Sequence, residues 1–464
     1  MKAAIIGGGV IGGGWAARFL LNGWDVAVLD PDPEAERKIT EVLDNARRAL
    51  PGLYDAALPP EGRLRFADDL AQACADADWI QESVPERLEI KHSVLAEIDA
   101  AATASAVIGS STSGFKPSEL TAKGARAIVA HPFNPVYLLP LVELVGEAAQ
   151  CARAAPLLQQ LGMYPLHVRK EIDAHIADRF LEAVWREALW LVKDGVATTA
   201  EIDEAIRMGF GLRWAQMGLF ETYRVAGGEA GMKHFMAQFG PALEWPWTKL
   251  MDVPEFTEEL VDLIAGQSDA QSGHMSIREL ERLRDDNLVG ILRALRRTGS
   301  GAGGVITDHE ASLSVPVVDP PVTAQQQVPV TWTDYNGHMN ETHYLELASR
   351  GTDGFMGLIG ADAAYVASGM SYFTLENTVR YLAEVHAGES LAVTTYATLA
   401  VGKKMGLRHL LTKPDGTVAA EVDSLLIHVS LETRRSCPPP NDMMDRLEAF
   451  VATHTKALAA LSER

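Results

Sequence analysis

Three things are scarce in this sequence of 464 residues, and each scarcity excludes a class of protein. The three cysteines, Cys74, Cys151 and Cys437, have the spacing of neither a disulfide framework nor a metal-binding cluster. No apolar run is long enough to span a bilayer, and no signal peptide precedes the first predicted strand. Basic residues number 41 against 62 acidic ones, and the net charge of −21 disfavours nucleic acid or an anionic membrane as a partner. We expect a cytoplasmic, metal-free protein of two to four domains.

The first thirty residues contain a complete dinucleotide-binding pattern. A strand at 2–6 runs into G-x-G-x-x-G, a helix follows, and a second strand at 25–29 ends in an acid. The glycines make a tight turn, admit the pyrophosphate and let the helix pack, while the acid binds the ribose 2′-OH. Asp32 adds a second negative charge that repels a 2′-phosphate, so the pattern predicts NAD rather than NADP. The predicted contacts are Gly7, Gly9, Val10, Ile11, Gly12 and Asp30.

A proline-rich apolar segment carries a histidine and a glutamate. Short strands are predicted at 126–130 and 141–145, and the prolines between them forbid a helix. If the chain doubles back at Tyr137, which is equidistant from both, His131 and Glu143 become neighbours on adjacent strands. An imidazole held by a carboxylate is a general base near neutral pH. A buried histidine satisfied by a convenient acid has the same pattern, so these residues alone leave both interpretations open.

Two further motifs follow predicted strands of the same sheet. Ser83–Glu86 comes after a strand at 79–82, and Ser111–Gly114 comes after a strand at 106–110. Doubly wound sheets bind ligands at the carboxyl ends of their strands. Turn formation or helix capping explains the hydroxyl run at 111–113 equally well.

The combination resembles the 3-hydroxyacyl-CoA dehydrogenase superfamily over about residues 1–300. The matching pieces are GGGVIGGGWAARFLLNGWDVAVLD, WIQESVPERLEIK, GSSTSGFKPSEL and HPFNPVYLLPLVELV. GFGLRWAQMGLFET is similar to the subgroup that acts on the small free acids gulonate and carnitine. The resemblance implies an α/β Rossmann domain at 1–170 and an all-α domain for substrate binding and dimerisation at 171–300.

The resemblance also implies roles for individual residues. His131 becomes the catalytic base, Glu143 its orienting partner, and Ser113 the residue that binds the substrate hydroxyl. Ser111 is expected near the substrate, and Glu86 and Lys91 near the nicotinamide.

One departure from the family pattern concerns the substrate. The helical domain of the family usually opens with Asn-Arg, whereas this chain has Asp178-Arg179. An acid there suits a quaternary ammonium, as in L-carnitine, or it pairs with Arg179. Aromatic residues further on are candidates for a cation–π cage, or else for a helical core and dimer interface. The candidates are Trp214, Phe220, Tyr223 and Trp245.

The C-terminal part has a different pattern. Gly299–Gly304 is glycine-rich and predicts a flexible break, within a linker at 301–322. A strand at 328–331, a helix at 341–358 and four later strand-like segments predict an α+β domain at 323–464. This part resembles the hotdog thioesterases of the 4-hydroxybenzoyl-CoA type, through WTDYNGHMN.

The hotdog motif departs from its family at one acid. Asp334 stands at the first acidic position, but Asn336 replaces the carboxylate that is usually catalytic. Both are candidate catalytic residues, and His338 and Asn340 are expected to contact an acyl-CoA substrate near the following helix N-terminus. The resemblance implies NAD-dependent oxidation of L-carnitine coupled to hydrolysis of betainyl-CoA in a homodimer. A gulonate-like dehydrogenase with a purely structural C-terminal dimerisation domain is the alternative.

Overall fold

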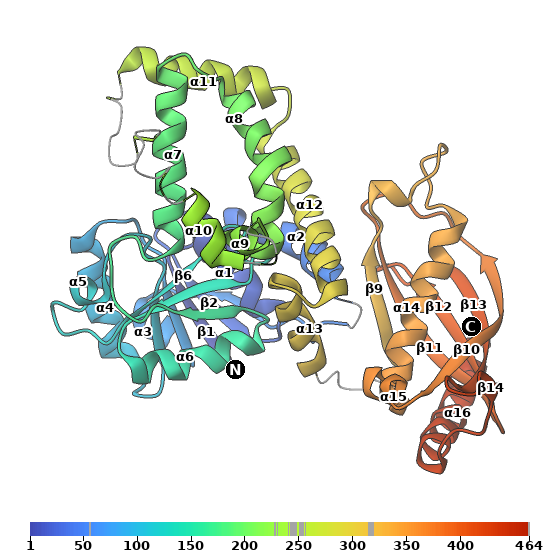
Figure 1. The fold of residues 1–464 in the computed structure, drawn as a ribbon. Coiled ribbons are helices and arrows are strands. Elements are labelled where there is room, and N and C mark those ends of the chain that lie inside the picture. The colour runs from blue at the N-terminus through green and yellow to red at the C-terminus, as the bar shows by residue number, and fades with distance from the viewer. Residues whose placement is uncertain are drawn as a thin grey trace. The chain divides into compact units, whose positions relative to one another are not determined.

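The protein is described from a computed structural model. It describes every residue except 55–56, 227–228, 230, 240, 242–247, 250–254, 256, 314–319 and 463–464. The chain forms two compact units (Figure 1). The first comprises Met1–Leu20, Trp24–Leu43 and Gly62–His309, and the second comprises Leu21–Gly23, Asp44–Glu61 and Glu310–Arg464.

The first unit contains an eight-stranded sheet in the order β3-β2-β1-β4-β5-β6-β7-β8. Neighbouring strands run parallel except β6 and β7, which are antiparallel. The central strands are apolar and buried on both faces, as parallel sheets require. The strands are β1 (Lys2–Ile6), β2 (Asp25–Leu29), β3 (Leu64–Phe66), β4 (Trp79–Glu82), β5 (Val107–Ser110), β6 (Ile128–Pro132), β7 (Leu141–Val145) and β8 (Tyr164–His167).

Helices cover this sheet and fill its faces with aromatic side chains. Trp15 and Phe19 on the first helix are buried and pack against each other and against Trp79 of β4. These contacts fix the helix that follows the glycine-rich turn, and with it the turn itself. The helices are α1 (Val10–Leu20), α2 (Ala35–Ala49), α3 (Leu70–Cys74), α4 (Leu88–Ala101), α5 (Pro117–Leu120) and α6 (Ala148–Gln160), with a 3₁₀ turn at Leu50–Leu53.

A helical region completes the first unit. Capping boxes begin two of its helices, at Thr198 and at Ser276. The Tyr137 hydroxyl donates to the buried Asp285 carboxylate at 2.7 Å, which ties the helical region to the segment between β6 and β7. The helices are α7 (Ala177–Lys193), α8 (Thr199–Ala205), α9 (Gly211–Ala226), α10 (Gly231–Phe239), α11 (Glu258–Ser272), α12 (Ile277–Thr298) and α13 (Ala302–Ser312), with a π-helical turn at Ile206–Phe210.

The expected flexible break at Gly299–Gly304 is wrong, because these residues form a tight turn between two helices. Gly299 ends α12 in the left-handed conformation, with φ 61°. A side chain at Gly303 would collide with the backbone of Leu295, so glycine permits close helix packing there. His309 Nε2 lies 3.0 Å from the Gln160 carbonyl oxygen. The first part of the predicted linker is therefore helical and packed.

The second unit is an antiparallel sheet in the order β10-β13-β12-β11-β9, with β14 beside β13. Helix α14 packs on the sheet, as in a hotdog fold (Figure 1). The expected strand at 328–331 is wrong: the strand ends at Gln327, before Pro329, which cannot donate to a ladder. The elements are β9 (Val322–Gln327), a 3₁₀ turn (Val330–Trp332), α14 (Glu341–Ile359), α15 (Ala363–Ala367), β10 (Met370–Tyr381), β11 (Ser390–Val401), β12 (Lys404–Thr412), β13 (Val418–Ser430), β14 (Arg435–Ser436) and α16 (Asn441–Ser462).

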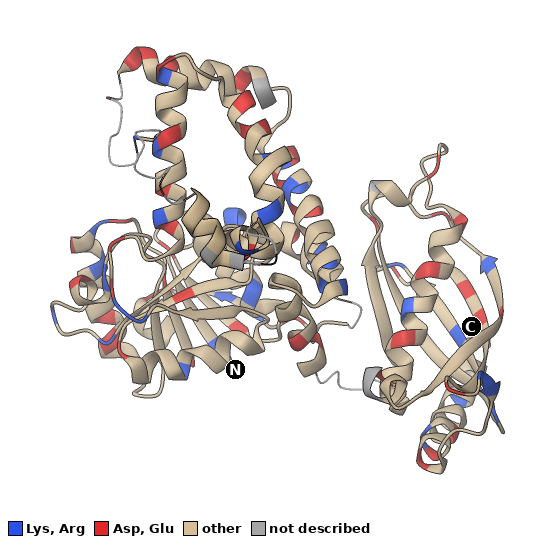
Figure 2. Ribbon diagram, viewed as in Figure 1, with Lys and Arg blue, Asp and Glu red and all other residues tan. Residues whose placement is uncertain are grey.

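The predicted fold class, a Rossmann α/β domain and an all-α domain followed by an α+β hotdog domain, is confirmed. Acidic and basic side chains are interspersed along the elements of both units (Figure 2). Within the described part of the chain, every helix is too short or too polar to cross a bilayer.

Candidate active sites

His131 and Glu143 are partners across the antiparallel β6–β7 pair, as their spacing predicts. His131 Nδ1 lies 3.1 Å from Glu143 Oε2, and both residues are buried. The other carboxylate oxygen, Oε1, accepts hydrogen bonds from the backbone N–H groups of Ile176 (2.9 Å) and Ala177 (3.0 Å), where α7 begins. The helix N-terminus thus holds the carboxylate, and the carboxylate holds the imidazole.

The electrostatics of this pair suit a general base. Burial alone would raise the pKa of Glu143, but hydrogen bonds from His131, Ala177 and Ile176 outweigh it, and the pKa is lowered. An ionised Glu143 accepts from Nδ1–H of His131. The lone pair of His131 is therefore on Nε2, the nitrogen that can take a proton from a substrate.

Asp178 lies beside that second nitrogen. Its Oδ2 atom is 3.6 Å from His131 Nε2, and its side chain is 20% exposed. Burial raises the pKa of Asp178, the negative charge of Glu143 adds to this, and the charge of His131 opposes it. The acid found in place of the family asparagine thus contacts the candidate base.

His175 is a site residue that the sequence did not indicate. It is fully buried, its ring centre is 5.6 Å from that of His131, and its backbone is left-handed, with φ 50°. Its Nε2 lies 3.3 Å from the Thr112 carbonyl oxygen, which can only accept, so Nε2 carries the proton. Its Nδ1 is buried without a hydrogen-bond partner among the described residues. Nothing local could have revealed this position, because two distant loops create it.

The strand-end motifs form one polar network at the ends of β4 and β5. Lys91 is buried in an ion pair with Glu82 (2.9 Å) and lies 3.2 Å from Glu86, whose side chain is 45% exposed. Ser111 Oγ accepts from the Gln81 amide at 2.8 Å, and Ser113 is exposed. The sequence did not indicate Gln81 and Glu82, since both lie inside a buried strand.

The glycine-rich turn has room for a dinucleotide where the family needs it. Side chains at Gly7 or Gly12 would collide with the backbone of Ser83 and of Gly7 respectively, whereas a side chain at Gly9 would meet nothing within 4 Å. Gly9 is therefore open toward solvent at the start of α1, where backbone N–H groups can receive a pyrophosphate. Asp30 follows β2, and its carboxylate accepts from Gly8 N–H at 2.5 Å. These residues fit NAD, which supplies a hydride acceptor when bound.

The candidate aromatic residues have different surroundings. Trp214 packs on Phe210 and Tyr223 stacks on Phe235, while Phe220 is 72% exposed. Trp245 lies outside the described residues. A cage made of these rings stays a prediction.

In the second unit, the hotdog motif forms a turn before α14. Asp334 Oδ1 accepts from the backbone N–H of Asn336 at 2.8 Å, and the Asn336 amide nitrogen lies 3.5 Å from the other oxygen. Asn340 caps α14, because its side-chain oxygen accepts from Thr342 N–H at 3.0 Å. The helix N-terminus and Asp334 thus lie at one end of the domain.

A second histidine–carboxylate contact lies at this end. His338 Nε2 is 3.5 Å from Glu384 Oε2, and these side chains are 35% and 72% exposed. One ring nitrogen each of His338 and His386 and one carboxylate oxygen of Glu384 all lie within 4.8 Å of one another. The sequence did not indicate Glu384 and His386, which come from the distant connection between β10 and β11. A cavity of about 330 Å³ is lined by Asp334, His338, Glu341, Tyr344, Tyr381 and Glu384, among others.

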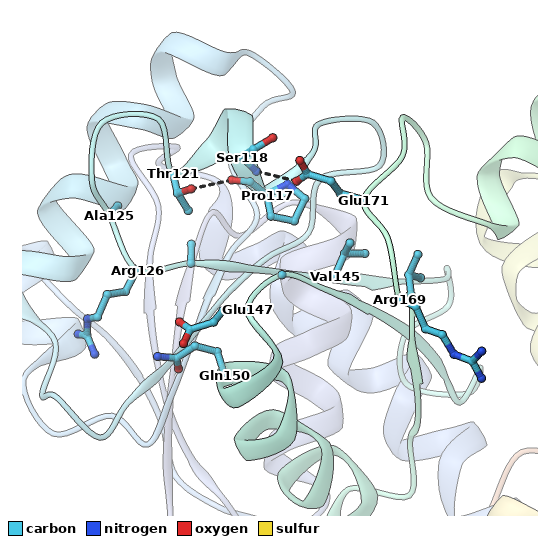
Figure 3. Close-up of a pocket in the computed structure, with 13 residues that line it drawn as sticks. Pro117, Ser118, Thr121, Ala125, Arg126, Val145, Glu147, Gln150, Arg169 and Glu171 are labelled. Atoms are coloured by element: carbon cyan, nitrogen blue, oxygen red, sulfur yellow. Dashed lines mark hydrogen bonds between the residues drawn. The ribbon is translucent and has the colours of Figure 1, made fainter.

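A separate hollow of about 440 Å³ is lined by residues of α5, β7 and α6 and by Glu171 (Figure 3). Glu171 accepts from the backbone N–H of Ser118 at 3.0 Å, and Glu147 and Gln150 lie on the opposite side. None of the predicted catalytic or cofactor residues lines it.

Comparisons with known proteins divide the chain in the same way. Family models match residues 2–172 (3-hydroxyacyl-CoA dehydrogenase, NAD binding domain), 175–259 (3-hydroxyacyl-CoA dehydrogenase, C-terminal domain) and 328–447 (thioesterase-like superfamily). The L-carnitine dehydrogenase/betainyl-CoA thioesterase of Ruegeria pomeroyi is 63% identical, over 99% of this chain and 97% of its own length. Its counterpart in Agrobacterium fabrum is 56% identical, over 97% and 94% respectively.

Relatives of the first unit alone are also similar. The L-carnitine dehydrogenase of Pseudomonas aeruginosa is 54% identical and covers 65% of this chain and 95% of its own length. The crystal structure of 5-formyl-3-hydroxy-2-methylpyridine 4-carboxylic acid 5-dehydrogenase, an NAD⁺-dependent dismutase, superposes with a TM-score of 0.54 at 26% identity. It covers 63% of this chain and 98% of that one.

Proposed function

Because this chain belongs to the family of the L-carnitine dehydrogenase/betainyl-CoA thioesterases, we propose that it oxidises the 3-hydroxyl of L-carnitine with NAD and hydrolyses betainyl-CoA. The observation that carries the first activity is the buried His131–Glu143 pair, with Nε2 of His131 left as an acceptor. A separate enzyme that consumes acetyl-CoA would convert the first product, 3-dehydrocarnitine, into the substrate of the second activity.

In the dehydrogenase reaction, NAD held at Gly9 and Asp30 would supply the acceptor for the hydride that leaves C3 of carnitine. His131 Nε2 accepts the hydroxyl proton as the C–O double bond forms. Glu143 keeps the imidazole in the required tautomer and stabilises its charged form, and the backbone donors of α7 keep Glu143 ionised. Ser113 binds the substrate hydroxyl, with Ser111 beside it in the network at the end of β5.

Selection of a cationic substrate is the proposed role of Asp178. Its carboxylate is the negative charge nearest the nitrogen that receives the proton, and it is only partly exposed. Carnitine carries its quaternary nitrogen one carbon from C3, within reach of such a charge. Trp214, Phe220, Tyr223 and Trp245 remain candidates for the rings that complete the site.

In the thioesterase domain, Asp334 is the carboxylate proposed to activate water. The N-terminus of α14 faces the developing oxyanion of the thioester, with His338 in the lining of the neighbouring cavity and with Asn336 and Asn340 in the turn before the helix. Glu384 holds His338. We further propose a homodimer, because exposed apolar side chains are frequent on the helical region, among them Phe180, Leu181 and Trp185. We propose a cytoplasmic location because the three cysteines are free, which suits a reducing compartment.

The test is a pair of assays on the purified chain. NADH formation is measured with L-carnitine, gulonate and 3-hydroxybutyryl-CoA, and thiol release is measured with betainyl-CoA. We expect carnitine to be preferred and betainyl-CoA to be cleaved. A preference for gulonate together with no cleavage of any acyl-CoA would favour the alternative, a gulonate-like dehydrogenase with a structural C-terminal domain.

A further inference from the structure

The oxidation releases one proton in every turnover, and that proton arrives at a buried atom. The hydride leaves C3 with two electrons, and the hydroxyl proton goes to His131 Nε2. His131 must lose this proton before it can act again. Its side chain is 6% exposed, and that of Glu143 is 0% exposed. Direct transfer from the imidazole to bulk water is therefore obstructed, and a second group is needed to pass the proton on.

Asp178 is placed to receive it. Its Oδ2 atom lies 3.6 Å from Nε2, the nitrogen that carries the proton, and its side chain is 20% exposed. One carboxylate thus touches both the catalytic nitrogen and the solvent. Burial raises the pKa of Asp178. A proton on the His131 imidazolium therefore passes to Asp178 at a lower cost in free energy than it would to an ordinary aspartate.

The other titratable groups around Asp178 are less suitable. Glu143 is bound to Nδ1, the wrong nitrogen, and its pKa is lowered. His175 is fully buried, donates its Nε2–H to Thr112, and has its pKa lowered, first by burial and then by the charge of His131. Glu182, one turn further along α7, is 45% exposed and lies 3.5 Å from Arg186. Among these groups, Asp178 alone combines contact with Nε2 and access to water.

We propose that Asp178 is the proton exit of the dehydrogenase. The O–H proton of the substrate passes to His131 Nε2, then to Asp178 Oδ2, and then to water, which leaves a neutral imidazole and an ionised carboxylate for the next turnover. This inference rests on the proposed carnitine oxidation. An asparagine, the residue usual in the wider superfamily, cannot accept a proton and would close this route.

The experiment follows NADH and protons separately in a single turnover. The full-length enzyme is mixed with NAD and carnitine in weakly buffered solution that contains a pH indicator. In the wild type and in the control Glu182→Gln, which removes a carboxylate from the same helix, proton release should keep pace with NADH. In Asp178→Asn, NADH should still form in the first turnover, but protons should emerge about 10²-fold more slowly. Asp178→Glu, which keeps a carboxylate at this position of α7, should restore the rate.

Three results would be decisive against the exit. Protons could keep pace with NADH in Asp178→Asn, Asp178→Glu could fail to restore their release, or Asp178→Asn could bind NAD and carnitine yet form no NADH, which would assign Asp178 to the chemical step instead. Asp178→Ser serves as a second carboxylate-free variant if Asp178→Asn does not fold. If the wild type forms no NADH from carnitine, the proposed function itself fails, and this outcome is distinct from the other three.

Discussion

His131 in the first unit and His409 in the second are held in opposite ways. In the first unit, His131 is buried against an ionised carboxylate that backbone donors hold in place. In the second, the fully buried His409 is surrounded by hydroxyls: Thr395 lies 2.8 Å from its Nδ1 and Thr352 lies 3.0 Å from its Nε2. His338 and His343 of that unit, which face the carboxylates of Glu384 and Glu346, are both part-exposed. Burial by itself makes a neutral structural histidine, whereas burial beside a fixed charge makes a base.

The most severe test of this comparison removes the base. His131→Ala should lower kcat for carnitine oxidation by about 10²–10⁴-fold, because no other group accepts the hydroxyl proton directly. NAD affinity and betainyl-CoA hydrolysis should stay near the wild-type values. The matched control is His167→Ala, which removes an exposed histidine of β8. Turnover close to normal in His131→Ala would refute the assignment.

The second test concerns the neutral histidine. Burial lowers the pKa of His409 to about 4. Its stabilising contribution is complete above about pH 6.5, the pKa in the unfolded chain, and falls as the pH drops toward 4, because only the unfolded chain binds the proton. The free energy of unfolding of the C-terminal domain should therefore fall by about 3 kcal/mol over this range. His409→Gln should flatten the pH dependence, as measured by urea unfolding at several pH values. An equally steep dependence in this variant would contradict the claim.

The third test removes the charge but keeps the two backbone hydrogen bonds. In Glu143→Gln, the amide oxygen can still accept from Ile176 and Ala177, while the NH2 group faces His131 Nδ1 and donates to it. The imidazolium loses its counter-charge, and the neutral ring is held with its proton on Nε2. We expect kcat to fall by at least tenfold, because Nε2 is no longer the free acceptor, and the acidic limb of the pH–rate profile to move to lower pH, because the imidazolium has lost its counter-charge. Glu147→Gln, at an exposed position just beyond β7, is the control. A profile that keeps its acidic limb would mean that Glu143 only packs against the ring.

The fourth test asks whether Asp178 recognises charge. Asp178→Asn should raise KM for carnitine by roughly fivefold, since a part-exposed charge pair contributes about 1 kcal/mol. KM should change little for the analogue in which a carbon atom replaces the quaternary nitrogen. First-turnover NADH formation over a series of concentrations of both compounds measures the difference, because the proton release that the same substitution slows comes after that step. An equal increase in KM for the two compounds would show that Asp178 does not recognise the charge of the substrate.

The smallest effect is expected at the exposed pair. Glu384→Gln should slow betainyl-CoA hydrolysis by less than about threefold, because exposed ion pairs contribute little. The rate of thiol release from betainyl-CoA measures this effect, and Glu376→Gln, which removes an exposed carboxylate of β10, is the control. A loss as large as that in Glu143→Gln would show that the two pairs work alike and would end the contrast between the units.

Part of this organisation could be predicted from the sequence, where local chemistry determines geometry. The glycine-rich turn and the proline-rich segment after His131 are such places. The prolines forbid a helix, so the segment turns back at its midpoint, and this places Glu143 opposite His131. His175, Gln81 and Glu384 could not be predicted, because each meets the sites through segments distant in the chain.

Two local errors have physical reasons. The glycines at 299–304 indicate flexibility by composition, yet they permit close helix packing at Gly303. The predicted strand at 328–331 overlooked Pro329, which has no N–H for a ladder.

The hydrogen bonds from Ile176 and Ala177 to Glu143 have a consequence for how the enzyme responds to damage. The strand that carries the catalytic carboxylate belongs to the nucleotide-binding domain, while its donors belong to the first helix of the substrate domain. The readiness of His131 to accept a proton therefore depends on whether these two domains are docked, because the donors of one domain keep the carboxylate of the other ionised. A substitution that loosens the start of α7, even at a position that contacts no ligand, should first show itself as a shifted pH optimum and only later as a lowered melting temperature.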